Sequence, residues 1–334
     1  MKTNTSADQK SSLSNNVLCF GDCNIDILVL IEKLPELGGC SWSDKYKIDI
    51  GGTMINTLVA LNRLGVDAYP VTKVGGDYNG SLIKEYLSKL DINIDRVFTD
   101  NYQTGMVIGL VEPCGEKRWI GATVNAANNH VKFDEISLKD VPKYLFLAGS
   151  ELSKGVESKN AAFELAKTVS TAGGTVFLDP NLRITNSELS AEVRETFNKM
   201  MPNIDYLLAN KNETLLLGNS SNLDDAARNL LKQGAKNVWV KKGGAGSIFY
   251  SNNLAADFEP YPVEVRDTSG AGDAFNAAVV YSIFNGYDID TTGKFANIFA
   301  AYTVGRLGTS SSLPPQKEIK KMLQLCKNAG VISK

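Results

Sequence analysis

Two aspartates flank a short glycine-rich run in the last third of the chain. Asp267 and Asp273 stand on either side of Ser-Gly-Ala-Gly, and an apolar run with helical spacing follows. The backbone N–H groups of Gly270, Ala271 and Gly272 can converge at the start of that predicted helix, where an anion such as a phosphate would bind. A carboxylate repels a phosphate, but it is well suited to remove a proton from a hydroxyl that attacks one. The segment therefore predicts phosphoryl transfer with Asp273 as the general base.

The same segment also has a structural interpretation. Asp and Ser before a helix are common N-caps, and glycine-rich turns occur in many proteins. Asp267, which precedes the turn, would either ligate a cation or cap the loop. Further motifs are needed to choose between a catalytic and a structural role.

The segments that must position these residues alternate between strands and helices. Strands are predicted for short β-rich runs at 17–20, 69–74, 144–147, 175–178, 205–209 and 238–240. Helices are predicted for runs with helical spacing at 56–64, 81–90, 158–171, 224–233, 271–284, 291–307 and 316–326. This order predicts an α/β fold with a doubly wound, mostly parallel sheet that is flanked by helices.

Two stretches interrupt the alternation. Residues 27–50 and 106–123 have β-type patterns with no helix between their strands, which is typical of antiparallel strands or hairpins. We expect them to form a small accessory sheet. With no repeat or linker in the remainder, 17–334 is predicted to be one domain, and the polar segment 1–16 is predicted to be a disordered tail.

The composition excludes several classes of partner. The 334 residues include 35 Lys and Arg against 37 Asp and Glu, so the net charge of −2 gives no general attraction for nucleic acid or an anionic membrane. No segment approaches the length of a membrane span. Five cysteines without a CxxC pair, together with a single histidine, favour a reduced, cytoplasmic protein without a soft-metal site.

With these features in view, the sequence resembles the ribokinase-like (PfkB) carbohydrate and nucleoside kinase family from about Val17 to Pro314. The run from Asp267 to Asp273 is similar to the C-terminal motif of that family. The resemblance implies a ribokinase-like fold in which the accessory sheet is a lid. It also implies that Asp273 is the catalytic base and that the amides of Gly270, Ala271 and Gly272 form the anion hole.

Two further motifs resemble the sugar-binding elements of the family. Gly-Asp-Cys-Asn-Ile-Asp, ending at Asp26, is similar to the family pattern Gly-x-x-Asn-x-Asp, so Asn24 and Asp26 are expected to bind substrate hydroxyls. Gly51 and Gly52 open a segment that is similar to the N-terminal signature. The resemblance implies that their backbone approaches the substrate and that Asn56 forms a hydrogen bond with it.

Three motifs resemble the nucleotide-binding elements. Asn210 and Glu213 match the family pattern Asn-x-x-Glu, whose glutamate helps to place Mg²⁺ through water. Gly243 and Gly246 match a glycine turn beside the nucleotide. Lys241 precedes this turn and is assigned to the nucleotide site, although it and Lys242 stand where Thr and an apolar residue are more common and both would ordinarily face solvent. The third motif, Asp-Pro-Asn-x-Arg at 179–183, is expected near substrate or phosphates.

A possible cation site follows from the same resemblance. Gly308 and Ser312 match positions that form a monovalent-cation site in ribokinase-type members together with Asp267 and the backbone of Ser269. This implies that K⁺ activates the enzyme.

The sequence thus predicts an ATP- and Mg²⁺-dependent kinase that phosphorylates a sugar, a sugar acid or a polyol. A nucleoside kinase is the alternative, with Trp42, Tyr46 or Trp119 of the lid stacking on a base. A nonenzymatic sensor on the same fold is a third possibility, but it would not need the base and the anion hole. A Rossmann dehydrogenase and a Walker-type ATPase are excluded because neither Gly-x-Gly-x-x-Gly nor Gly-x-x-x-x-Gly-Lys-Ser/Thr follows a strand. The edges of the lid predict a homodimer.

Overall fold

A nine-stranded sheet forms the centre of the computed structural model, which describes residues 13–112, 117–182, 188–306, 308 and 310–328. Its seven neighbouring strands from β11 to β5 are parallel, and β12 and β13 extend it in antiparallel fashion. In spatial order the strands are β13 (Ala255–Phe258), β12 (Ser247–Ser251), β11 (Asn237–Lys241), β10 (Tyr206–Asn210), β9 (Thr175–Asp179), β8 (Pro142–Ala148), β1 (Ser14–Phe20), β4 (Ala68–Gly75) and β5 (Val97–Asp100).

Helices cover both faces of this sheet and bury two separate apolar layers. The first layer contains α1 (Thr53–Arg63), α2 (Tyr78–Lys89), α7 (Ala271–Phe284), α8 (Ile289–Val304) and α9 (Gln316–Asn328). The second contains α3 (Val156–Thr171), α4 (Ala191–Met200), α5 (Lys211–Leu217) and α6 (Leu223–Lys232). Alternate residues of β1 point into opposite layers, as a strand buried on both faces requires. The predicted doubly wound α/β fold is confirmed.

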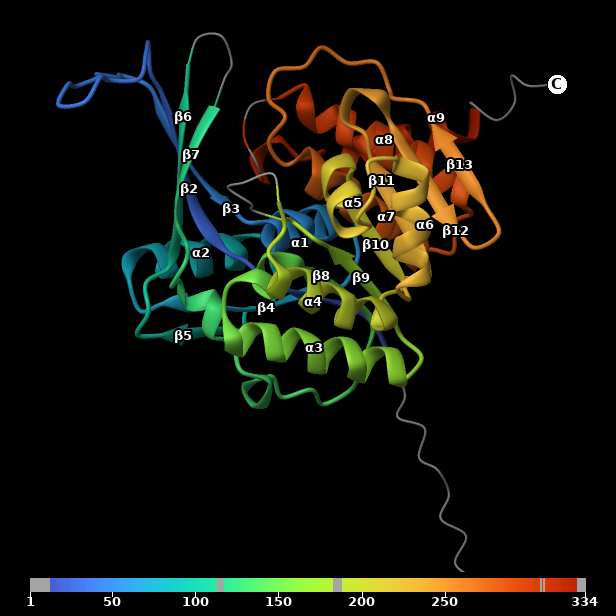
Figure 1. Ribbon diagram of the computed structural model, residues 1–334. Helices are drawn as coiled ribbons and strands as arrows, with labels where there is room; N and C mark the ends of the chain where they lie inside the picture. The colour runs from blue at the N-terminus through green and yellow to red at the C-terminus, as the bar shows by residue number, and fades with distance from the viewer. Residues whose placement is uncertain (1–12, 113–116, 183–187, 307, 309, 329–334) are drawn as a thin grey trace, which may run out of the picture.

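A second, four-stranded sheet projects from the body beside α2 (Figure 1). Its order is β3 (Tyr46–Gly51), β2 (Asn24–Leu30), β6 (Gly105–Val111) and β7 (Lys117–Ala122). The β2–β3 and β6–β7 pairs are antiparallel, whereas β2 and β6 run parallel. Between β3 and β6 the chain passes through the main-sheet strands β4 and β5. The accessory sheet is therefore two hairpins joined side by side.

The boundary of the predicted N-terminal tail is wrong by three residues within the described part of the chain. β1 begins at Ser14 rather than at residue 17, because the Ser14 N–H donates to Val141 O at 3.0 Å and Ser14 pairs with Pro142. The register shifts between Ser14 and Val17, so the polar residues continue the strand through an irregularity. The preceding residues 1–12 lie outside the described part.

The carboxyl ends of the parallel strands gather the polar residues of the motifs at one edge of the sheet. Asp22 follows β1, Asp179 ends β9 and Lys241 ends β11. In open α/β sheets this edge is where ligands bind. Across the described residues, no helix is both long and apolar enough to cross a membrane.

Candidate active site

Asp273 lies in the first turn of α7, where the predicted base should be. Gly270 is the N-cap of this helix and has a φ of 75°, a left-handed conformation that glycine adopts without strain. The half-buried carboxylate of Asp273 accepts a hydrogen bond of 2.7 Å from Asn56 Nδ2 in the first turn of α1. The structure thus joins two motifs that are more than 200 residues apart in the sequence.

The surroundings of Asp273 raise the pKa of its carboxyl group toward neutral pH. Burial raises its pKa to about 7, with a further increase from the negative charges of Asp179 and Asp22, while the Asn56 hydrogen bond and the positive charge of Lys241 act in the opposite direction. A base that titrates near the working pH combines a large ionised fraction with a useful affinity for the proton.

The amides at the start of α7 are available to an anion. The first amides of an α-helix have no acceptor within the helix. Of these, Ala271 N–H makes a single backbone contact among the described residues, a long one of 3.4 Å with Thr268 O. Gly270, Ala271 and Gly272 therefore present N–H groups next to Asp273, at the positive end of a 14-residue helix.

The predicted sugar-binding residues lie at the junction of the lid and the body. A Cβ on Gly51 would overlap the carboxylate of Asp26, and one on Gly105 would overlap Asn24 Oδ1, so both polar groups lie against glycine backbone. Gly52 has a φ of 108°, and a Cβ there would lie 2.7 Å from Asp22 O. Gly51 beside Asp26 and Gly105 beside Asn24 thus leave no room for a side chain.

Buried polar atoms without a protein partner mark the interior of this region. Among the described residues they include Asn24 Oδ1, Asn56 Oδ1 and Asn181 Nδ2. Asn181 also has a φ of 40°, which is uncommon for a residue with a side chain. Buried polar groups are normally hydrogen-bonded, so these atoms are suited to meet a polar ligand.

Asn210 and Glu213 form a capping box at the start of α5. Asn210 Oδ1 accepts from Glu213 N at 2.9 Å, and Glu213 Oε2 accepts from Asn210 N at 2.8 Å. The other oxygen, Oε1, accepts from Leu182 N at 3.0 Å, which ties α5 to the segment after β9. Glu213 is buried, and burial followed by the charge of Asp179 raises its pKa, while Lys241 opposes this.

The glycine turn after β11 is exposed at its tip, from Gly243 to Ala245, whereas Gly246 is buried. Gly243 and Gly246 have φ angles of 61° and 80°, and the turn is closed by a hydrogen bond of 2.8 Å from Lys242 N to Gly246 O. Lys242 Nζ pairs with the exposed Asp257 at 2.7 Å, but the Lys242 side chain is only 17% exposed, so the expectation that it faces solvent is wrong.

The expectation that Lys241 faces solvent is wrong. Its side chain is only 13% exposed, and Nζ lies 2.9 Å from Asp179 Oδ2 and 3.1 Å from Asn276 Oδ1. The reason is that β11 runs in the middle of the sheet, beside β10, so its last residue points along the edge toward α7. Asp179 thus pairs with a lysine from β11, while Arg183 of its own motif lies outside the described residues.

Asp267, Ser269 and Gly308 of the predicted cation site also come together. Asp267 Oδ1 accepts from Ser269 N at 2.8 Å, and Oδ2 accepts from Gly308 N at 3.1 Å. Gly308 has a φ of 111°, and Ser312 is buried in the following short helix. Asp267 therefore links the loop before α7 to the loop after α8.

Sequence reasoning missed Glu151, which follows β8 at the same edge of the sheet. Its side chain is fully buried, Oε1 accepts from Asn128 Nδ2 at 2.9 Å, and Oε2 has no hydrogen-bond partner in the described part of the chain. Burial, followed by the charge of Asp22, raises the pKa of Glu151 to about 8. No local signal identified it, because a glutamate after Gly-Ser in a loop ordinarily faces solvent.

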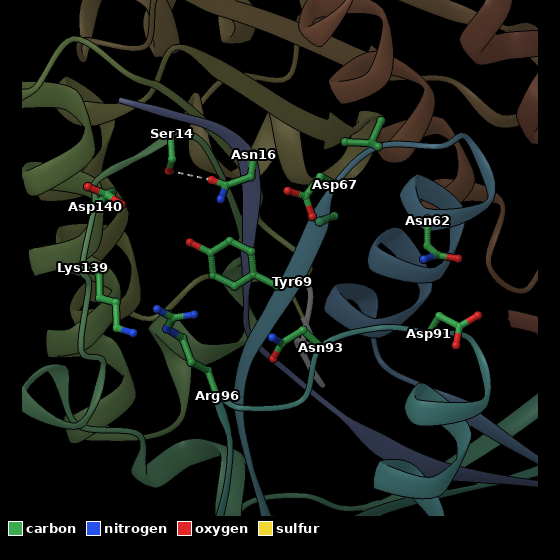
Figure 2. Close-up of a pocket in the computed structure, with 12 residues that line it drawn as sticks. Ser14, Asn16, Asn62, Asp67, Tyr69, Asp91, Asn93, Arg96, Lys139 and Asp140 are labelled. Atoms are coloured by element: carbon green, nitrogen blue, oxygen red, sulfur yellow. Dashed lines mark hydrogen bonds between the residues drawn. The ribbon is translucent and has the colours of Figure 1, made fainter. Parts of the chain in front are cut away.

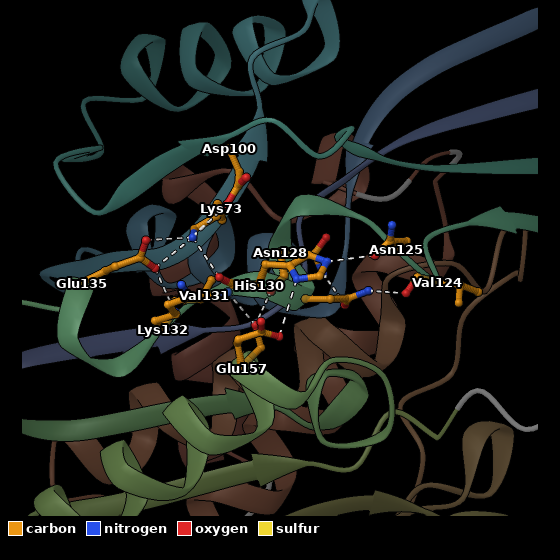
Figure 3. A network of polar contacts seen from close by, with 12 residues as sticks. Lys73, Asp100, Val124, Asn125, Asn128, His130, Val131, Lys132, Glu135 and Glu157 are labelled. Atoms are coloured by element: carbon orange, nitrogen blue, oxygen red, sulfur yellow. Dashed lines mark hydrogen bonds and ion pairs between the residues drawn. The ribbon is translucent and has the colours of Figure 1, made fainter.

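His130 belongs to a network that supports the base of the lid (Figure 3). Its ring stacks on Tyr102 with 3.7 Å between centroids, and Nε2 lies 2.9 Å from Asn125 Oδ1. Its backbone oxygen accepts from Lys73 Nζ, a buried ammonium that also pairs with Asp100 and Glu135. The only histidine of the chain is thus part of the scaffold next to the site.

Two cavities lie away from Asp273. One of about 410 Å³, shown in Figure 2, lies at the amino ends of β1 and β4, where Arg96 stacks over Tyr69 at 5.0 Å. The other, of about 510 Å³, lies between Tyr261 and the outer faces of α8 and α9. Neither is lined by Asp273, so the sequence motifs, and not the cavities, locate the candidate site.

Comparison with known proteins yields one family. Residues 14–316 match the model of the pfkB family carbohydrate kinases. The chain is 24% identical to ribokinase of Bacillus subtilis, covering 92% of this chain and 99% of that protein. It is 25% identical to 5-dehydro-2-deoxygluconokinase 2 of Bacillus cereus, covering 83% and 86%.

Solved structures agree with this result. A crystal structure of an E. coli protein assigned as a ribokinase II, in complex with ATP and Mg²⁺, superposes with a TM-score of 0.80 at 26% identity, covering 93% of this chain and 99% of that one. The matches confirm both the resemblance that the motifs indicated and the fold class.

Proposed function

Because the chain belongs to the pfkB family of carbohydrate kinases, we propose that it transfers the γ-phosphoryl group of ATP to a hydroxyl of a sugar, a sugar acid or a polyol. The observation that supports this most directly is the position of Asp273. Its carboxylate is held by Asn56 directly beside the first amides of α7. A base and an anion hole are thus adjacent, as phosphoryl transfer to an alcohol requires.

The proposed step uses three groups of this chain. Asn24, Asp26 and the backbone of Gly51 and Gly52 orient the substrate hydroxyl. Its oxygen forms the new bond to the γ-phosphorus, the bond between that phosphorus and the β–γ bridging oxygen breaks, and the electron pair of that bond leaves with ADP. The hydroxyl proton passes to Asp273, and the amides of α7 stabilise the negative charge on the phosphoryl oxygens.

The carboxylate of Glu213 is suited to hold Mg²⁺ through bound water. Each carboxylate oxygen of Glu213 accepts one backbone N–H, which leaves a further lone pair on each for an ordered water. Mg²⁺ prefers such hard oxygen donors and usually keeps several waters. Bound there with ATP, the ion would neutralise charge on the triphosphate.

Replacement of the base tests the reaction. Asp273→Asn keeps the shape of the side chain but cannot accept the proton, and we expect kcat to fall at least 100-fold while sugar binding is retained. A coupled ADP-release assay over pentoses, hexoses, ketoses, sugar acids, inositols and nucleosides measures kcat. Asp290→Asn, an exposed change on α8, is the matched control. A kcat for Asp273→Asn close to that of the wild type would disprove the base assignment.

A nucleoside kinase remains the second candidate. It is supported by three exposed aromatic residues of the lid, since Trp42, Tyr46 and Trp119 have exposures of 86%, 70% and 48% and are accessible for stacking on a base. The same substrate panel decides between the two. Higher kcat/KM for adenosine or inosine than for every sugar would establish the nucleoside kinase.

Activation by K⁺ is supported by the contacts of Asp267, which brings together the loops that carry Ser269 and Gly308. We expect kcat to rise in potassium buffer relative to sodium-only buffer, and Asp267→Asn to reduce this activation. Equal rates in the two buffers would exclude it.

Homodimerisation is supported by an apolar row across the lid. Ile48, Ile27, Ile108 and Ile120 lie directly opposite one another on four neighbouring strands, so they share one face of the lid sheet. Ile48 and Ile120 are more than half exposed. An apolar face of this kind is normally covered, and a second copy of the lid would cover it.

A further inference from the structure

Lys241, the last residue of β11, brings a buried cation to the start of α7. Its Nζ lies 2.9 Å from Asp179 Oδ2 and 3.1 Å from Asn276 Oδ1. Asn276 is one turn after Asp273 on the same helix. Nζ also lies 3.7 Å from the position that a Cβ on Gly272 would take. The ammonium group is therefore adjacent to both the predicted anion hole and the predicted base.

The ion pair with Asp179 alone does not account for this lysine. Asp179 Oδ2 also accepts from Asn276 Nδ2 at 2.6 Å, and Oδ1 accepts from Asn181 N at 2.8 Å. A buried ion pair often contributes no more stability than a neutral, well-packed replacement, because both charges lose their hydration.

The ammonium group also retains a donor for a ligand. It has three N–H donors, and the hydrogen bonds between described residues account for two of them. An anion beside Gly272 would supply the third acceptor.

We propose that Lys241 is a catalytic residue whose ammonium group contacts the γ-phosphoryl group during its transfer, and that Asp179 and Asn276 are positioning residues that hold it in place. The proposal rests on the proposed function and adds a specific charge to it. Lysine binds phosphate as a compact point charge, which suits a contact with one or two phosphoryl oxygens.

The positive charge of Lys241 would offset an electrostatic repulsion in the site. The ionised base and the phosphoryl group are both negative, so their approach is unfavourable without a cation between or beside them. During transfer Lys241 keeps its protons, the hydroxyl proton goes to Asp273, and ADP leaves with the electrons of the broken P–O bond. Lys241 would attract the phosphoryl oxygens throughout, from a site shielded from water where such a contact is strong.

The test compares Lys241→Met with Lys242→Met, a neighbouring lysine whose ammonium pairs with the exposed Asp257 instead of Asp179. Lys241→Gln is included because its amide can still donate to Asp179 if the Met variant does not fold. For each variant kcat is measured with the best substrate of the panel, and thermal unfolding is followed. Dissociation constants for ADP and for the nonhydrolysable analogue AMP-PNP are measured by calorimetry.

We expect kcat to fall about 100-fold or more in both Lys241 variants, the typical loss for one electrostatic contact to a transition state, and to stay within twofold in Lys242→Met. In both Lys241 variants the dissociation constant for AMP-PNP should rise about tenfold or more relative to that for ADP, because only AMP-PNP carries the third phosphoryl group. A purely structural lysine would lower the unfolding temperature and leave that ratio unchanged.

A kcat within threefold of the wild type, or an unchanged ratio of dissociation constants, overturns the proposal. Failure of the proposed function gives a different result. In that case the wild-type protein phosphorylates no sugar, sugar acid or polyol of the panel, while the nucleotide ratio still reports on Lys241.

Discussion

Replacement of Glu151 by Gln should stabilise the protein, and increasingly so as the pH rises. Glu151 is 0% exposed, and burial is the main cause that raises its pKa to about 8, with Asp22 adding to the effect. Lys154 and the hydrogen bond from Asn128 oppose it. Glutamine has the same shape, retains the oxygen that accepts from Asn128 and carries no charge at any pH.

The magnitude follows from the difference between the folded and unfolded states. An unperturbed glutamate titrates near pH 4.3. Between about pH 5 and pH 8 the unfolded chain has released this proton and the folded protein keeps it, so the free energy of unfolding falls by about 1.4 kcal/mol per pH unit because of this residue. The favourable contribution is complete below pH 4 and is lost as the pH rises through 8. At pH 7 the accumulated loss is roughly 4 kcal/mol.

Urea unfolding of the wild type and of Glu151→Gln between pH 5.5 and pH 8.5 measures this difference. The gap in the free energy of unfolding should widen with pH by about 1.4 kcal/mol per unit. Glu164→Gln, an exposed change on α3, should give a gap that does not depend on pH. Parallel curves for Glu151→Gln and the wild type would refute the reasoning, because they would mean that Glu151 is ionised in the folded protein.

Three further outcomes are expected. Because Asp273 must be ionised to act as a base and its pKa is raised to about 7, kcat/KM should fall about tenfold per pH unit below pH 7; a flat pH profile from 5.5 to 8 would contradict this. Ile48→Asp combined with Ile120→Asp should convert a dimer to monomers in analytical ultracentrifugation, and an unchanged mass would exclude the lid as the interface. Lys73→Met should lower the free energy of unfolding by about 2 kcal/mol, less than for a fully buried pair because Asp100 and Glu135 reach solvent. Denaturant unfolding measures this loss, and no loss would show that the network is not stabilising.

Much of the fold was predictable because its signals are local. Alternating apolar patterns over five to fifteen residues specify strands and helices, and their order along the chain specifies a parallel sheet. The start of β1 was not predictable, since Ser14 is polar and becomes part of the strand only through its pairing with β8, more than 120 residues away. The parallel pairing of β2 with β6 depends in the same way on a distant segment.

The sequence by itself determined the chemistry of the candidate site. Asp273 with its glycine run is a contiguous segment whose residue types indicate a base beside an anion site. The Asn24 and Asp26 pair and the Asn210 to Glu213 motif are also contiguous, and they resemble the hydroxyl-binding and nucleotide-binding elements of the family. Only the tertiary structure decided the electrostatics. The burial of Lys241 against Asp179, the hydrogen bond from Asn56 to Asp273 and the raised pKa of Glu151 all come from residues far apart in the chain. Burial and charge proximity are properties of the folded surroundings, so no local pattern encodes them.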